Sequence, residues 1–293
     1  MAYNTLKTSL EDGVLTLSLS RPERMNAFTV EMANELVAFF TMVNDDDNVR
    51  AIIVTGEGKA FCAGMDLSIP GNVFGLDETL RPTRADMDER LHDASIHSGV
   101  RDTGGRVTLA IFNCRKPVIA AINGAAVGIG ATMTLAMDVR LASENARIGF
   151  VFGKIGIVPE ACSSWFLPRI VGISQALEWV YTGEILKPDA ALAGGLVKAV
   201  VAPDQLLSEA KALARKFSQN RSPVAVALAR QMLYRNAAAN HPLEAHKVDS
   251  LAVFYTSMDD GKEGVRAFLE KRDPVFTAKA STDMPPFYDD WAQ

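Results

Sequence analysis

Residues 116–133 read KPVIAAINGAAVGIGATM, and the order of elements in this stretch decides the fold. The apolar run at 117–122 predicts a buried strand, and a helix is expected from about Gly130 onward. The turn between them contains Gly128 and Ile129. Glycines let a backbone approach a ligand closely, and the first N–H groups of a helix point toward it with a favourable dipole. We therefore expect a strand, a ligand-facing turn and a helix in succession.

The Gly128-Ile129-Gly130 sequence also resembles the opening of a dinucleotide-binding fingerprint. That fingerprint continues with a third glycine, but this chain has Met133 at the corresponding position. No acidic residue ends a second strand near position 150, where a ribose-binding carboxylate belongs. A nicotinamide cofactor is therefore not expected, although the backbone donors of the turn remain available for another ligand.

Outward from this stretch, pairs of strands precede helices. Residues 5–20 alternate in polarity across Asp12-Gly13, which is typical of a hairpin. Residues 29–44 have helical apolar spacing, and 50–56 form a buried-strand pattern. Two more short strands are expected, at 139–143 and 147–150. The fold class is therefore α/β with a repeated β-β-α order, but no clean βαβ period fixes a doubly wound topology.

The C-terminal part of the chain is mainly helical. Short helices separated by Gly and Pro are expected after Glu160, with one strand at 197–202. Longer helices are expected at 203–218, 223–239 and 242–271. We divide the chain into residues 1–202, a β-β-α core that carries the site, and residues 203–293, a helical region.

Residues 68–103 differ from both parts because they are rich in Gly, Pro, Asp and Arg. A single short helix is expected within them, at about 84–95. Connections of this length with little regular structure are commonly functional, so we expect this segment to lie over a site.

Composition excludes several classes of protein. A net charge of −5 leaves no broad basic face, so neither nucleic acid nor an anionic membrane is an expected partner. No secretory pattern or long apolar span is evident, and the cytoplasm is the expected location. Cys62, Cys114 and Cys162 are odd in number and widely spaced, which fits free thiols. The four histidines lie in pairs five residues apart, a spacing that does not favour metal ligation.

A second turn with backbone donors is expected at 58–68, which reads GKAFCAGMDLS. If this turn and the one at Gly128 converge, they form an oxyanion hole. Each N–H donor of such a hole stabilises a developing negative charge by on the order of 3 kcal/mol. The alternative is that both are tight turns that only connect strands.

Together FCAGMDLS, KPVIAAINGAAVGIGATM, GIVPEACSSWFLPRIVG and DAALAGGLVKAVV resemble the crotonase superfamily of enoyl-CoA hydratases and isomerases, over about residues 5–275. The resemblance implies a spiral of β-β-α turns with a C-terminal helical region that builds homotrimers, often paired as dimers of trimers. It implies an acyl-CoA thioester as substrate, with coenzyme A as part of that substrate and no prosthetic group.

By the same resemblance, the N–H groups of Met65 and Ile129 hold the thioester oxygen, although the family usually has glycine at the second position. Phe268 and Lys271 are implied to reach coenzyme A from the same or a neighbouring subunit. The groove for coenzyme A is implied to be lined by Arg24, Met25, Ala27, Lys59, Ala63, Asp66 and Leu67.

Family hydratases use two glutamates, and the positions that match them here are Thr132 and Phe152. Neither side chain acts as a general base near neutral pH, so standard hydratase chemistry is not expected. Glu160 instead matches the single catalytic glutamate of Δ3,Δ2-enoyl-CoA isomerases, which move a proton from C2 to C4. The expected walls of the pocket are Gly128, Thr132, Phe150, Phe152, Ile155, Ile157, Val158 and Trp165.

Other interpretations stay open at this point. Glu160 follows Pro159 and can simply stabilise the start of a helix, worth roughly 0.3 to 1 kcal/mol. The matching position in 4-chlorobenzoyl-CoA dehalogenase is a nucleophilic aspartate, but its ring-polarising aromatics have no clear counterpart here. A hydratase with a different second acid, or a non-catalytic or RNA-binding relative, is also compatible with the fold. The candidate second acids or bases are Asp86, Asp88, Glu89, His92 and Asp93.

Overall fold

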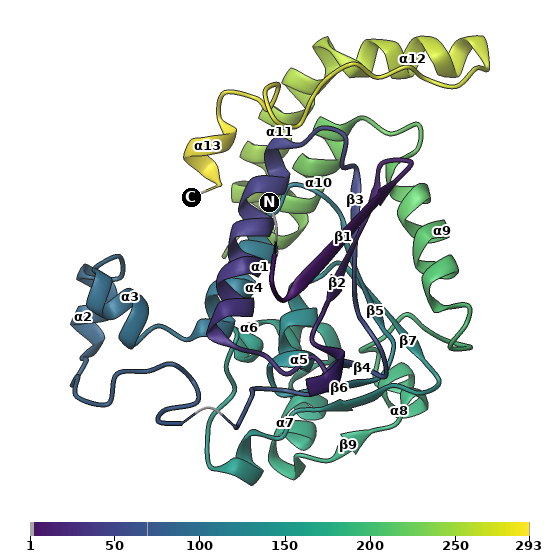
Figure 1. Cartoon of the computed structure of the whole chain (residues 1–293). Helices are drawn as coiled ribbons and strands as arrows, with labels where there is room; N and C mark the ends of the chain where they lie inside the picture. The colour runs from purple at the N-terminus through teal and green to yellow at the C-terminus, as the bar shows by residue number, and fades with distance from the viewer. Residues whose placement is uncertain (1–2, 69, 293) are drawn as a thin grey trace.

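The structure is a computed structural model that describes residues 3–68 and 70–292. It is an α/β fold built on two sheets (Figure 1). The larger has the order β1-β2-β3-β5-β7-β10, in which β1 and β2 form an antiparallel hairpin and the other neighbours are parallel. Its strands are β1 (Leu6–Glu11), β2 (Val14–Leu19), β3 (Ala51–Gly56), β5 (Val118–Ile122), β7 (Val139–Ser143) and β10 (Ala199–Val201).

The smaller sheet explains the β-β-α order of the sequence. Each of β3, β5 and β7 is followed by a short strand of the small sheet, so the chain passes from one sheet to the other in every turn of a spiral. The strands of the small sheet are β4 (Ala60–Cys62), β6 (Ala125–Val127), β8 (Arg147–Gly149) and β9 (Ile185–Leu186). The expected crotonase-type spiral is therefore confirmed.

Strand β3 shows why the large sheet needs apolar residues on both faces. Ala51 and Ile53 pack toward α9 (Leu206–Ser218), whereas Ile52 and Val54 belong to the main core on the other face. That face is covered by α1 (Val30–Met42), which packs along α4 (Thr103–Asn113). Alternate side chains of a strand point to opposite faces, so a strand covered on both sides reads as a continuous apolar run.

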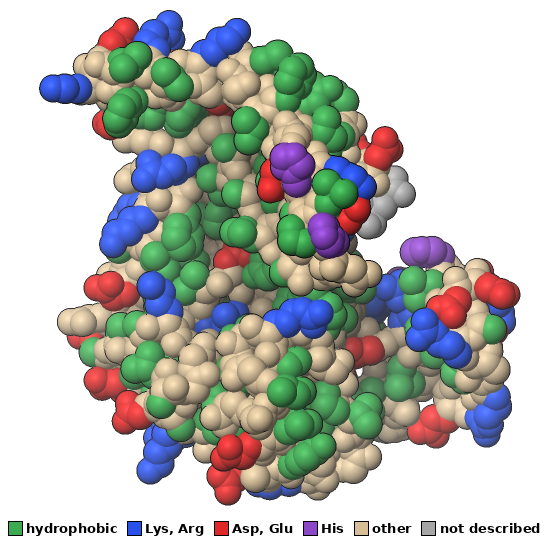
Figure 2. All heavy atoms as spheres, turned by 180° about the vertical axis from the view of Figure 1, so that it is seen from behind, with side chains coloured by type: hydrophobic (Ala, Val, Ile, Leu, Met, Phe, Trp, Pro, Cys, Tyr) green, Lys and Arg blue, Asp and Glu red, His purple; other side chains and the backbone are tan. Residues whose placement is uncertain are grey.

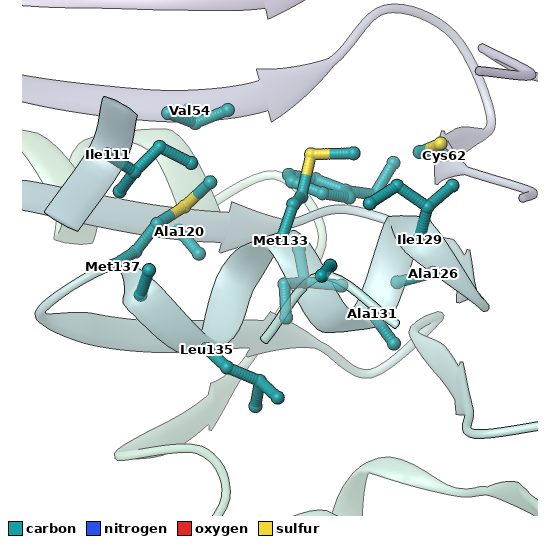
Figure 3. Packing of buried hydrophobic residues seen from close by; sticks show 14 of the residues in the cluster. Val54, Cys62, Ile111, Ala120, Ala126, Ile129, Ala131, Met133, Leu135 and Met137 are labelled. Atoms are coloured by element: carbon teal, nitrogen blue, oxygen red, sulfur yellow. The ribbon is translucent and has the colours of Figure 1, made fainter. Parts of the chain in front are cut away.

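The turn quoted from the sequence lies within the main core (Figure 3). It leads into α5 (Ile129–Thr132), which a 3₁₀ turn extends through Met133–Ala136. A Cβ on Gly130 would stand 2.0 Å from the backbone oxygen of Cys62, so this position needs glycine. Absence of that side chain lets α5 lie directly against the end of β4.

The remaining helices pack behind the sheets or extend from them (Figure 1). The expected helix at 242–271 is two helices, because Asp259 has a non-helical backbone between α11 and α12. Strand β9 and the last helix were not expected. These helices are α6 (Ser163–Val171), α7 (Ile173–Thr182), α8 (Pro188–Ala193), α10 (Pro223–Asn236), α11 (Pro242–Met258), α12 (Asp260–Glu270) and α13 (Tyr288–Trp291).

The predicted long segment is described at residue 68 and at 70–103. The described part leaves the body and returns (Figure 1), and it projects as a lobe at the right of the space-filling view from behind (Figure 2). It contains two short helices, α2 (Arg84–Glu89) and α3 (Ala94–Gly99), where one was expected. Thr83 forms a capping box at the start of α2, and Asp93 is the N-cap residue of α3. Each of the two helices therefore has its own polar residue at its N-terminus.

The division of the chain at residue 202 stays a prediction. Helix α9, which follows this residue, packs on the large sheet. Among the described residues, no helix is both long and apolar enough to cross a membrane.

Candidate active site

A mostly apolar cavity of about 420 Å³ opens where β4 and β6 end. The segment after β4, the turn after β6 and the segment before α6 each form part of its wall. Phe74, Leu76 and Val100 come from residues 68–103, so the expectation that this segment lies over a site is confirmed. The other lining residues are Phe28, Ala63, Gly64, Met65, Leu67, Asp102, Thr103, Gly104, Val127, Gly128, Ile129, Val151, Phe152, Ile155, Ile157, Val158 and Glu160.

The turn after β4 places the Met65 N–H group beside the cavity. Phe28 bonds to the residues on either side: its N–H donates to Gly64 O at 2.7 Å, and its carbonyl accepts from Asp66 N–H at 2.9 Å. Within the described part of the chain, the N–H of Met65 has no hydrogen-bond acceptor. The alternation of a strand pairing therefore leaves this donor free for a ligand.

The turn after β6 provides a similar donor at Ile129, the first residue of α5. Gly128 has a φ of +53°, and a Cβ there would have nothing within 4 Å, so its backbone faces open space. Its carbonyl accepts from Ala131 and Thr132, whereas the N–H of Ile129 has no acceptor among residues 3–68 and 70–292. Strands β4 and β6 are parallel neighbours, so both turns leave the sheet at the same edge.

Glu160 enters the cavity from a strained turn. The next two residues, Ala161 and Cys162, both have a φ of +54°, which is costly for a side chain with a Cβ. The Thr132 hydroxyl donates to Glu160 Oε1 at 2.6 Å. Burial raises the pKa of Glu160 to about 8, with a further contribution from the charge of Asp102, and the Thr132 hydrogen bond opposes both. A buried carboxyl with this pKa can gain and lose a proton near neutral pH.

Asp102 is the second carboxylate of the cavity, and the sequence analysis missed it. Its oxygens accept from three backbone N–H groups: Gly104 at 3.0 Å and Gly105 at 2.8 Å in the first turn of α4, and Ala161 at 2.6 Å. The Asp-Thr-Gly-Gly sequence is a recognisable helix start, with Asp102 as the N-cap. The bond to Ala161 ties this cap to the turn that carries Glu160.

Gly104 provides the space into which Glu160 projects. A Cβ at this position would stand 2.4 Å from Glu160 Oε2 and 2.5 Å from Ile129 Cδ1. Both distances are below any normal contact of a Cβ atom. The absent side chain therefore makes room for the carboxyl beside the first turn of α4.

Three of the expected pocket residues do not line the cavity. Thr132 is fully buried behind Glu160 and contacts the site only through its hydroxyl. Trp165 packs on Phe166 and under the Arg169 guanidinium, because α6 starts only at Ser163 and turns that side chain away. Phe150 is also buried elsewhere, stacked on Trp179. Gly128, Phe152, Ile155, Ile157 and Val158 do line the cavity, as expected.

The residues expected at coenzyme A fall into two groups. Ala63 and Leu67 line the cavity, and Ala63 N–H donates to Met25 O at 3.1 Å, which joins the turn after the first hairpin to the site. Asp66 is buried, and its hydrogen bonds with Ser68 and Arg21 lower its pKa to about 2. The others lie at the surface nearby or beside these turns: Arg24, Met25 and Lys59 are exposed and Ala27 is half-buried.

Other predicted groups lie away from the cavity. Phe268 is 82% exposed on α12, and Lys271 is exposed at the end of that helix. Helix α12 contributes no residue to the cavity. None of the five candidate second acids and bases in the 68–103 segment lines the cavity, and Asp86, Asp88 and Asp93 pair with arginines of their own segment.

Comparisons with known proteins agree with this geometry. The family model described as enoyl-CoA hydratase/isomerase matches residues 9–279. The chain is 41% identical to "Enoyl-CoA hydratase ACTT3" of Alternaria alternata, over 90% of this chain and 83% of the relative. It is 33% identical to "1,2-epoxyphenylacetyl-CoA isomerase" of Escherichia coli (strain K12), over 92% of this chain and 97% of the relative.

Solved structures give the same result. An enoyl-CoA hydratase from Bacillus anthracis superposes with a TM-score of 0.79 at 30% identity, covering 94% of this chain and all of the other. A putative enoyl-CoA hydratase from Streptomyces coelicolor A3(2) has a TM-score of 0.81 at 28% identity. The two-sheet spiral and the neighbouring turns after β4 and β6 agree with these matches. The chain belongs to the enoyl-CoA hydratase/isomerase family of the crotonase superfamily.

Proposed function

We propose that this protein is an enoyl-CoA isomerase that converts a 3-enoyl-CoA to a 2-enoyl-CoA. The observation that carries the proposal is the unequal state of the two carboxylates in the cavity. Glu160 accepts one hydrogen bond, from Thr132, and has a raised pKa. Asp102 is already held by three backbone N–H groups. One carboxyl is therefore available to carry a proton, which suits isomerisation better than hydration.

The backbone donors supply the other half of the chemistry. In this proposal, the N–H groups of Met65 and Ile129 hold the thioester oxygen and stabilise the enolate that forms when C2 loses a proton. Each such donor contributes on the order of 3 kcal/mol because the charge develops only along the reaction. Both residues line the cavity, and neither N–H has a protein acceptor within the described residues.

Glu160 then acts as the single base and acid. The C2–H bond breaks, its proton passes to the carboxylate, and its electron pair enters the enolate. The same proton, or one exchanged with solvent, returns from Glu160 to C4 as the double bond moves to C2. A pKa of about 8 suits both steps, since the carboxylate is basic enough to accept and its acid form still donates.

The cavity lining also limits the acyl group. Apart from Glu160 and Asp102, every lining side chain is uncharged, and most are apolar. We infer an acyl chain without a second charged group. The exposed Arg24 and Lys59, beside the turn that contacts Ala63, are suited to the phosphates of coenzyme A, and Phe268 and Lys271 would complete the groove from a neighbour in a homotrimer or a dimer of trimers.

Hydration of a 2-enoyl-CoA is the second candidate. It is favoured by the names of relatives that are 39% to 41% identical to this chain, all described as enoyl-CoA hydratases. Asp102 is the only other carboxylate that lines the cavity in the described part of the chain. A hydratase would have to use Asp102 as its second carboxylate while three backbone N–H groups already donate to it.

Proton NMR of a 3-enoyl-CoA and, in a separate sample, of a 2-enoyl-CoA, each incubated with the protein in D₂O, separates these candidates. Isomerisation yields the 2-enoyl thioester, with deuterium entering at C4 as Glu160 exchanges with solvent. A 3-hydroxyacyl product would show that a second acid or base takes part and would overturn the single-carboxyl proposal. The Glu160→Gln variant is the control for non-enzymatic migration of the double bond.

A further inference from the structure

We propose that Thr132 is a positioning residue that determines which oxygen of Glu160 carries the proton, by switching its one hydroxyl hydrogen between Glu160 and Gly128. The catalytic part of this inference rests on the proposed function above. The switch itself is a property of the chain and can be measured without any substrate.

The geometry places one donor between two acceptors. Thr132 Oγ1 lies 2.6 Å from Glu160 Oε1 and 3.2 Å from the carbonyl oxygen of Gly128. A hydroxyl has one hydrogen, so Thr132 makes one of these bonds fully at any moment. The side chain is completely buried, which leaves no room for water to substitute for it.

The charge of Glu160 decides between the two acceptors. A carboxylate accepts a stronger hydrogen bond than a neutral carbonyl, so Thr132 donates to Oε1 while Glu160 is ionised. This bond occupies Oε1 and leaves Oε2, beside Gly104 at the cavity wall, as the oxygen that takes the proton from C2. Once Oε2 is protonated, Oε1 is a weaker acceptor and the hydroxyl hydrogen is released to Gly128.

Release toward Gly128 has a consequence at the other side of the site. The Gly128 carbonyl and the Ile129 N–H belong to one peptide unit, and Ile129 is the proposed oxyanion donor. The carbonyl already accepts from the N–H groups of Ala131 and Thr132, and a further hydrogen bond from the hydroxyl polarises the unit more and strengthens its N–H as a donor. Thr132 would therefore support the enolate at the moment when Glu160 has become neutral.

The titratable groups beside Glu160 do not replace the Thr132 hydroxyl as its hydrogen-bond donor. The titratable groups that face it are Asp102 before α4, Cys62 at the end of β4 and Cys162 before α6. Burial raises the pKa of Cys62 to about 12 and also raises that of Cys162, so both thiols stay neutral when Glu160 titrates. Asp102 raises the pKa of Glu160, whereas the Thr132 hydroxyl lowers it.

Matched variants separate the hydroxyl from the shape of the side chain. Thr132→Val removes the hydroxyl and keeps the branched shape, and Thr132→Ser keeps the hydroxyl. Thr134→Val is the control, because Thr134 is also buried in the next turn but donates only to the carbonyl of Ala131. Thr132→Ala provides a second hydroxyl-free variant if the valine does not fit.

The readout is infrared difference titration of the free protein, in which the carbonyl stretch of the protonated Glu160 carboxyl is assigned by its absence in Glu160→Gln. We expect Thr132→Val to raise the titration midpoint by about one pH unit or more, since hydrogen bonds to charged groups are worth roughly tenfold or more in equilibrium. Thr132→Ser and Thr134→Val should titrate as the unmodified protein does. The protonated carboxyl should absorb at the same frequency in Thr132→Val as in the parent, because the switch has already moved the hydroxyl hydrogen to Gly128. The inference would be overturned by an unchanged midpoint in Thr132→Val, by an equal shift in Thr132→Ser, or by a higher carbonyl frequency in Thr132→Val.

Kinetics with a 3-enoyl-CoA complete the test. We expect kcat of Thr132→Val to fall about tenfold to a hundredfold with KM nearly constant, and Thr132→Ser to recover most of it. If the midpoint moves but no variant or parent isomerises the substrate, the proposed function fails and the switch stands. If the parent isomerises through Glu160 and the midpoint does not move, the switch fails alone.

Discussion

Two half-buried acidic residues, Asp138 and Glu160, differ in their surroundings. Asp138 accepts from Arg230 at 2.9 Å, from Tyr234 at 3.0 Å and from the N–H of Val118 at 2.8 Å. Arg230, itself buried, also donates to four backbone carbonyls. It therefore joins α10 to the C-terminal end of α4 and to the 3₁₀ turn Met133–Ala136. This cluster is a fully paired structural joint.

Among the residues that the structure describes, Glu160 has no ion-pair partner and one hydroxyl as its donor, and the negative charge of Asp102 acts on it. A chain selected only for stability would neutralise such a carboxyl or replace it with an apolar residue. The proposed function accounts for this contrast, because it gives the proton of Glu160 a use in the reaction. The predictions below test this contrast, beginning with the largest expected effect.

Arg230→Met should destabilise the protein by about 3 to 5 kcal/mol, because it leaves Asp138 and several carbonyls without their partner. Arg215→Met is the matched control, since Arg215 makes only long ion pairs at the surface, and its loss should cost about 1 kcal/mol or less. Urea unfolding measures both. Equal losses would mean that the Asp138 cluster is not a structural joint.

Glu160→Gln should stabilise the protein at alkaline pH. The folded-state pKa, about 8, lies above the value of 4.5 for an exposed glutamate, so folding holds a proton that the unfolded chain releases. Stability of the parent therefore falls as pH rises from about 4.5 to 8, whereas the amide does not titrate. Each pKa unit is worth about 1.4 kcal/mol, so we expect a gain of about 3 to 5 kcal/mol at pH 9 and little difference at pH 4.

Thermal unfolding at both pH values checks this gain. Glu178→Gln, on the exposed side of α7, is the control and should show no such pH-dependent difference. A Glu160→Gln variant that is less stable than its parent at pH 9 would show that the carboxyl is satisfied where it lies.

Gly104→Ala should lower kcat about a hundredfold, because the new Cβ would displace Glu160 Oε2 and Ile129 Cδ1. The helix itself should not suffer, since alanine is the better helix former by about 1 kcal/mol. Gly264→Ala on α12, where a Cβ meets only Phe276 at a normal 3.7 Å, is the control. Undiminished turnover in Gly104→Ala would mean that Glu160 tolerates displacement.

Asp102→Asn should have the smallest effect, a rate change of about tenfold or less. The amide oxygen can still accept from Gly105 and Ala161, and asparagine is also a good N-cap, so only the bond from the Gly104 N–H is lost. Removal of the negative charge should lower the pKa of Glu160. Since the base must be ionised, the rising limb of the pH–rate profile, expected near pH 8 in the parent, should move to lower pH. The exposed Asp93→Asn is the control, and an unmoved limb would remove Asp102 from the electrostatics of the site.

Much of this arrangement is predictable from the sequence, because motifs and periodicity are local. The hairpin, the spiral order and the positions of Met65, Ile129 and Glu160 at one cavity follow from strand patterns, glycine turns and the family resemblance. The roles of these residues remain predictions that the experiments above address.

The parts that were missed depend on contacts between distant segments. Asp102 reads as an ordinary helix cap, and only tertiary structure brings it to Ala161. Trp165 was wrongly placed in the pocket because two residues with positive φ, Ala161 and Cys162, precede α6 and set its orientation. Neither residue is a glycine, so the sequence does not indicate that the backbone has a positive φ at this turn.

Turnover of a 3-enoyl-CoA by Glu160→Gln is the most direct test of the central claim that one buried, unpaired carboxyl performs the reaction. Calorimetric binding of an unreactive acyl-CoA measures the integrity of the site in the same preparation. We expect kcat to fall at least about a thousandfold while the Kd stays within a few-fold of the parent. Turnover within tenfold of the parent, with binding intact, would contradict the assignment of Glu160 as the base.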